Sequence, residues 1–113
     1  MKILIIRNRA PEEQIREMLE GLETYIKLAV DVERNILAGG GEYNADCEEV
    51  LLEDGSCQED IWGADWYPDA RKVEFGALIN IRPHQGNRSM EIEDPKLRDR
   101  IETITRALLQ VDS

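Results

Sequence analysis

The ten residues VEFGALINIR, 73–82, constrain the fold more than any other part of the sequence. Apolar side chains occupy every second position from Val73 to Ile81. Successive side chains of a β-strand point to opposite faces, so a period of two over ten residues is typical of a strand. The sequence therefore predicts a buried strand over 73–82, and hence a sheet around it.

Two further elements are predicted near the N-terminus. The short apolar run KILIIR, residues 2–7, is typical of a buried strand. Pro11 and the two glutamates after it favour the start of a helix, and apolar residues then recur at helical spacing as far as Leu22. We therefore expect a strand over 2–7 and a helix over 11–23.

The middle of the chain is expected to form a hairpin and a second helix. Residues 25–32 and 36–38 are apolar and rich in β-branched side chains, which predicts two strands, and the glycines at 39–41 end the second one. Residues 44–55 begin with a capping residue, carry early acids and end at glycine, which favours a helix. A strand through 50–52 is the alternative.

The remaining segments complete the predicted order. Residues 56–70 show no sustained period and are expected to be a long connection, packed onto the body by Trp62 and Trp66. Asp94 and Pro95 favour the start of a last helix. Its predicted apolar face comprises Leu97, Ile101, Ile104, Leu108 and Val111.

This order places the protein among α+β folds. The first six elements match the βαββαβ order of ferredoxin-like (split βαβ) sheets, to which the chain adds a C-terminal helix. A chain of 113 residues is long enough to bury one core, so we expect residues 1–113 to form a single domain. Exposed sheet edges favour pairing, and a homodimer is therefore expected.

The net charge of −10 comes from one part of the chain. Residues 42–70 hold ten carboxylates and no Lys or Arg, which leaves 14 acidic and 14 basic residues elsewhere. Such a surface repels phosphates, so no nucleic-acid partner is expected. A basic protein partner or a cation suits it better.

The sequence also predicts the compartment and the state of the thiols. The apolar runs are too short for a membrane span or a signal peptide, so we expect a cytoplasmic protein with no membrane association. Cys47 and Cys57 do not form a C-x-x-C pair, and they are expected to be two reduced thiols.

The loop after the predicted strand is the main candidate binding site. Arginine presents a fork of donors that suits a carboxylate or a phosphate, and Gly86 allows close backbone approach. We therefore predict a module that recognises a protein partner or a small anion through this loop, 82–89, and the acidic segment 42–69, although the same arginines could pair with the chain's own acids. The candidate ligand-binding residues are Arg82, His84, Gln85, Asn87, Arg88 and Ser89.

A small phosphoester hydrolase is the alternative function. His84 is the only histidine, and a proton carrier between Arg82 and Arg88 is what cleavage of a phosphoester needs. No G-x-S-x-G, H-E-x-x-H, Walker or G-x-G-x-x-G motif is present, so a binding or regulatory role is favoured and no cofactor is expected.

A secondary acidic site is expected at Glu42, Asp46 and Glu49, beside Glu48. Carboxylate oxygens suit a hard cation, but their spacing matches no EF-hand or zinc pattern. Acids at a helix start are expected without any ion, so no metal is predicted.

Three stretches carry a family resemblance: residues 25–56, which contain ILAGGGEYNADCEEVLLEDGS, residues 58–68, and residues 77–102, which contain INIRPHQGNRSMEI. They resemble an uncharacterised bacterial family, well represented in cyanobacteria and known as a domain of unknown function. The resemblance implies a bacterial cytosolic protein and no specific activity. Similar proteins often carry His where this chain has Asn44, which argues further against a metal at Asp46.

Overall fold

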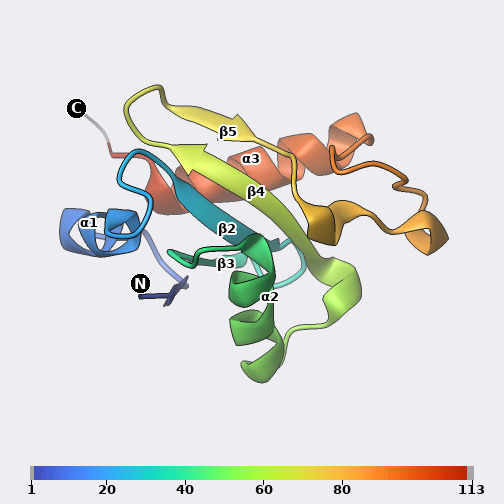
Figure 1. Ribbon diagram of the computed structural model, residues 1–113, viewed down its shortest axis with the longest axis horizontal. Helices are drawn as coiled ribbons and strands as arrows, with labels where there is room; N and C mark the ends of the chain where they lie inside the picture. The colour runs from blue at the N-terminus through green and yellow to red at the C-terminus, as the bar shows by residue number, and fades with distance from the viewer. Residues whose placement is uncertain (1, 112–113) are drawn as a thin grey trace.

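The computed structural model describes residues 2–111, which form a five-stranded sheet with helices on both faces (Figure 1). Its strands lie in the order β1-β3-β2-β4-β5, and every neighbouring pair is antiparallel. The strands are β1 (Leu4–Ile6), β2 (Ile26–Asp31), β3 (Ile36–Gly39), β4 (Ile61–Tyr67) and β5 (Lys72–Glu74). The α-helices are α1 (Glu12–Leu19), α2 (Asn44–Glu53) and α3 (Pro95–Leu109).

The alternation of side chains along the strands divides the apolar residues between two cores. Leu28 and Val30 of β2 belong to the larger core, which α1 and α3 cover. Ala29, between them in sequence, faces the smaller core together with Cys47 and Leu51 of α2. In Figure 1, α3 accordingly runs behind the sheet and α2 stands in front of it.

The predicted α+β class, the βαββαβ order and the additional C-terminal helix are confirmed. Residues 44–53 are helical, which excludes the alternative strand through 50–52. The side chain of Asp94 accepts a hydrogen bond from the backbone N–H of Lys96, as a helix cap does. Because α3 ends at Leu109, Val111 lies beyond the helix and is 44% exposed.

The fourth strand is not where the sequence predicted it. The segment 61–67, expected to be part of a connection, forms β4 and pairs with the whole of β2. Trp62, Ala64 and Trp66 face the larger core. Gly63 and Asp65, which lie between them, are unfavourable in strands, so the sequence did not indicate a strand here. The two tryptophans do hold the segment against the body, because both are almost fully buried.

The predicted strand over 73–82 is correct only in its first residues. The β5 ladder stops at Glu74, after which the chain leaves the sheet. Residues 76–79, the crossing segment, then pass over the α2 side of β4. Gly63 makes this crossing possible, since a Cβ there would lie 2.6 Å from the Cβ of Ala77. The apolar alternation therefore reflects packing of a crossing segment over β4 and not a ladder of ten residues.

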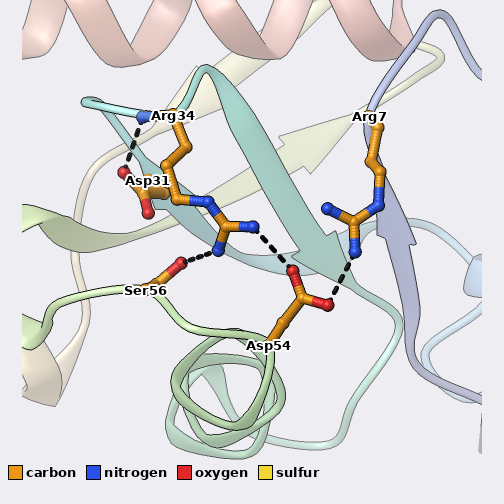
Figure 2. A network of polar contacts seen from close by, with 5 residues as sticks. All are labelled: Arg7, Asp31, Arg34, Asp54 and Ser56. Carbon is orange, nitrogen blue, oxygen red and sulfur yellow. Dashed lines mark hydrogen bonds and ion pairs between the residues drawn. The ribbon is translucent and has the colours of Figure 1, made fainter.

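A polar network joins the C-terminal end of α2 to β1 and to the β2–β3 turn (Figure 2). Asp54 accepts hydrogen bonds from Arg7 at 2.6 Å and from Arg34 at 2.8 Å. Arg34 also donates to the hydroxyl of Ser56 at 2.7 Å and, through its backbone N–H, to Asp31 at 2.9 Å. The two guanidinium groups lower the pKa of Asp54 and offset the unfavourable position of a carboxylate at a helix C-terminus.

Replacing Asp54 with asparagine is expected to lower the urea midpoint of unfolding at neutral pH. Because the folded-state pKa of Asp54 lies below its ordinary value of 3.8, its stabilising contribution is complete above that pH and is lost as the pH falls through the folded pKa. The difference between wild type and Asp54→Asn should therefore disappear in acid. Glu49→Gln, at an exposed position of the same helix, is the control. An equal difference at both pH values would contradict the assignment.

Candidate functional site

Arg82 lies inside the protein and not at its surface. It is 5% exposed, and its guanidinium donates to the backbone carbonyls of Gln58 at 2.7 Å, Ile79 at 3.0 Å and Ile61. The same group lies 4.0 Å from the centroid of the Trp62 ring. These contacts tie the predicted binding loop to the start of β4, and they engage the donors that were expected to face a ligand.

Glu48 supplies the charge opposite Arg82. It is 9% exposed on α2, where burial raises the pKa of its carboxyl while the positive charge of Arg82 opposes that rise. Arg82 in turn has its pKa lowered by burial. Within the described part of the chain, Glu48 and Arg82 form no ion pair, and Oε2 of Glu48 is buried without a hydrogen-bond partner, so the charge of Arg82 compensates that of Glu48 only at a distance.

Asn87 is also engaged within the loop. It is 5% exposed, and its amide donates to the carbonyls of Asn80 at 2.7 Å, Ser89 at 3.0 Å and Glu91 at 3.0 Å. Its side-chain oxygen accepts the backbone N–H of Glu93 at 2.9 Å. Asn87 therefore fixes the turn of the loop from within.

The other four predicted loop residues are exposed. Gln85 donates to the carbonyl of Glu59, and the hydroxyl of Ser89 donates to that of Glu91. The backbone N–H of Arg88 donates to the carboxylate of Glu93 at 2.7 Å. A ligand role for these exposed side chains stays a prediction.

The predicted acidic residues surround the first turn of α2. Glu42 and Glu49 are exposed and Asp46 is half-buried. In the described part of the chain, no group of three or more His, Cys, Asp or Glu side chains is arranged to hold a metal ion. Within the same residues, no helix combines the length and apolar character that a bilayer span requires.

A groove that the sequence did not predict lies between α2 and the crossing segment. Its volume is about 360 Å³, and the beginning of α2 forms one wall while residues 76–79 form the other. The lining residues are Lys27, Tyr43, Asn44, Ala45, Gly76, Ala77, Leu78, Ile79 and Met90. Neither Arg82, His84, Glu42 nor Asp46 is among them, so the convergence that a hydrolase needs does not occur in this groove.

The rim of the groove is apolar and open. Tyr43 is 60% exposed, Leu78 is 73% exposed and Met90 is 46% exposed, and all three belong to the lining. Soluble proteins normally scatter such side chains singly, and a contiguous set marks an interaction site. The groove therefore has the character of a binding surface.

Two buried asparagines attach the walls of the groove to the sheet. Asn44 donates to the carbonyls of Leu28 and Ala64, each at 2.9 Å. Asn80 exchanges hydrogen bonds with the backbone N–H and carbonyl of Gly63, at 2.8 and 3.0 Å, and donates to the carbonyl of Met90 at 3.2 Å. Because these bonds join groups of the protein itself, the groove is preformed.

One lining residue of the groove, Lys27, is charged. Lys27 is opposite Asp65 in the β2–β4 ladder, and Asp65 is 8% exposed. Burial raises the pKa of Asp65, and a hydrogen bond from Asn44 together with the charge of Lys27 opposes the rise. Lys27 is the one charged side chain among the described residues that line the groove.

The family model for "Protein of unknown function (DUF5674)" matches residues 4–108. The chain belongs to this family. The resemblance to a domain of unknown function is thereby confirmed, and every residue of the groove lies within the matched part of this DUF5674 protein. Searches of curated proteins and of solved structures found no match.

The groove residues of the DUF5674 protein had only weak signals in the sequence. Leu78 occupies a solvent-facing position of the predicted alternation, and Tyr43 and Met90 are apolar residues among polar neighbours. None of these residues indicates a binding site by itself, because isolated exposed apolar residues are common on protein surfaces. Only the fold brings together residues as distant in the chain as Lys27 and Met90.

The two thiols of the DUF5674 protein are expected to differ in reactivity. Burial raises the pKa of Cys47 to about 11, and its thiol lies 3.4 Å from the carbonyl oxygen of Lys27, whereas Cys57 is exposed. Because the thiolate is the reactive form, a disulfide reagent at about pH 8 should modify Cys57 in the native protein, and both thiols after denaturation. Cys57→Ser should abolish the native reaction, and rapid native modification of Cys47 would contradict its placement.

Proposed function

We propose that this protein is a non-enzymatic binding module whose groove docks an apolar side chain of a protein partner. The observation that carries the proposal is the coincidence of a preformed groove with the exposed side chains of Tyr43, Leu78 and Met90. Aromatic side chains and methionine are enriched at protein interfaces, where they supply the central contacts.

The chemistry of the lining favours binding over catalysis. Enzyme sites bring titratable groups together around a reacting atom, whereas the charged side chain that lines this groove is Lys27, opposite Asp65 in the ladder. We place the protein partner of the sequence prediction in this groove, beside the first turn of α2. A ligand role for the exposed residues of the loop 82–89 stays a separate prediction.

A phage-displayed library of random twelve-residue peptides, selected against the full chain, tests the proposal. The enriched peptides are expected to contain a large apolar residue and to lose at least about ten-fold in affinity on Leu78→Asp, the effect of losing a central interface contact. Leu52→Asp is the matched control, because Leu52 is a 38% exposed leucine outside the groove. Peptides that bind Leu78→Asp and wild type equally would refute the role of the groove.

The homodimer and the bacterial cytosolic setting are further parts of the proposal. The outer edges of β1 and β5 pair with no other strand of the described residues, which supports pairing between two copies. Light scattering after size-exclusion chromatography tests this point, and a monomeric mass at micromolar concentration would refute it.

A further inference from the structure

Carboxylates stand on both sides of the groove. Glu42 directly precedes Tyr43 on the α2 wall, and Glu91 directly follows Met90 on the other. Glu91 also approaches the lining itself, because its Oε1 is 3.1 Å from the position that a Cβ would take at Gly76. Each wall of the groove therefore has a glutamate directly beside one of its lining residues.

Glu91 also lines a neighbouring pocket together with the cations Lys72 and Arg98, but neither carboxylate is tied to a cation. Within residues 2–111, neither Glu42 nor Glu91 forms an ion pair. The positive charge of Lys27 is opposed by Asp65, which lies across from it in the ladder. The mouth of the groove therefore has a negative potential, which attracts cationic groups and repels acidic ones.

We infer that the partner segment is basic, with its apolar anchor in the groove and flanking lysine or arginine side chains paired with Glu42 and Glu91. This inference rests on the proposed function and names the chemistry of the partner. Charge complementarity of this kind adds selectivity to an apolar contact, because an acidic segment with the same anchor meets two like charges.

Two restricted peptide libraries test the inference on the 113-residue chain. One contains Lys and Arg but no Asp or Glu at its random positions, and the other contains Asp and Glu but no Lys or Arg. Binders that depend on the groove are expected from the first library alone. A binder depends on the groove if it loses affinity for the Leu78→Asp variant. The added carboxylate would strengthen the binding of a basic peptide held by charge alone, so a loss of affinity identifies the apolar contact.

Charge reversal then locates the flanking contacts. The double variant Glu42→Lys with Glu91→Lys is expected to weaken an enriched basic peptide about ten-fold or more, as the loss of two charge pairs predicts. The double variant Glu20→Lys with Asp99→Lys is the matched control, because it changes the net charge equally at exposed positions beside α1 and on α3, which cover the opposite face. Circular dichroism verifies that both variants remain folded.

The outcomes separate the inference from the proposed function. Groove-dependent binders from the acidic library, or equal weakening by the two double variants, would overturn the basic partner and leave the groove as the binding site. A lack of groove-dependent binders from both libraries would overturn the proposed function and this inference with it.

Discussion

Replacing Arg82 with alanine is expected to lower the free energy of unfolding by about 3 kcal/mol or more, because it removes a buried guanidinium that donates to three backbone carbonyls. The variant leaves the carbonyls of Gln58, Ile61 and Ile79 without their donor. It also leaves Glu48 buried without its opposing charge. Since unsatisfied buried groups retain their full desolvation cost, this loss should exceed that of an ordinary hydrogen bond.

Urea denaturation followed by circular dichroism measures this loss of stability. Two further variants show whether it comes from the guanidinium contacts. Arg88→Ala, in the same loop at an exposed position, should change stability little. Arg82→Lys should rescue only part of the loss, because an ammonium group keeps the charge but cannot reproduce the planar fork that reaches three carbonyls. An Arg82→Ala protein as stable as Arg88→Ala would show that the guanidinium contacts contribute nothing.

Replacing Asn80 with aspartate is expected to destabilise the protein by about 4 kcal/mol, from lost hydrogen bonds and from charge burial. Asn80 is fully buried, and its amide group donates to the carbonyls of Gly63, Phe75 and Met90. A carboxylate cannot donate to any of them and would bring a negative charge among their oxygens. Because the charge is the larger part of the defect, the variant should regain stability as the pH is lowered.

Denaturant titrations at neutral and acidic pH test this expectation, with the exposed Asn8→Asp as the matched control. The Asn80→Asp protein should also lose peptide binding in the groove, because the bond to Met90 holds one wall. A variant as stable as Asn8→Asp at neutral pH would disprove the role assigned to the amide.

The sequence predicted the elements whose pattern is local. The helices follow from apolar residues at helical spacing, and the hairpin follows from two apolar runs around a polar turn. Asp94 caps α3 as predicted, but Asn44, which was expected to cap the second helix, lies within α2 and donates to carbonyls of the sheet. β4 was missed because Gly63 and Asp65 occupy its α2-facing positions, where the sheet is covered by Ala77 and by Asn44. The strand predicted over 73–82 was too long. A segment that packs over the face of a sheet can show the same apolar alternation as a strand that pairs within the sheet.

The roles of the site residues depended on contacts between distant segments. A guanidinium fork suits a phosphate and suits backbone carbonyls equally well, and only the approach of residues 58–61 to Arg82 decides between them. A buried asparagine such as Asn80 has no distinctive sequence signal, since asparagine is ordinarily a turn residue. The groove required four separate segments, so no local pattern could have revealed it.

The side chain of Asn80 substitutes for a longer β5. β5 covers the outer edge of β4 only from Asp65 to Tyr67, and the carboxamide occupies the donor and acceptor of Gly63 further along that edge. Trp62 and Trp66 of β4 have high β-propensity, and an open strand edge beside such residues is a template for pairing with another chain. The Asn80 amide closes part of this edge, so we expect conditions that release the crossing segment from β4 to cause aggregation before the helices melt.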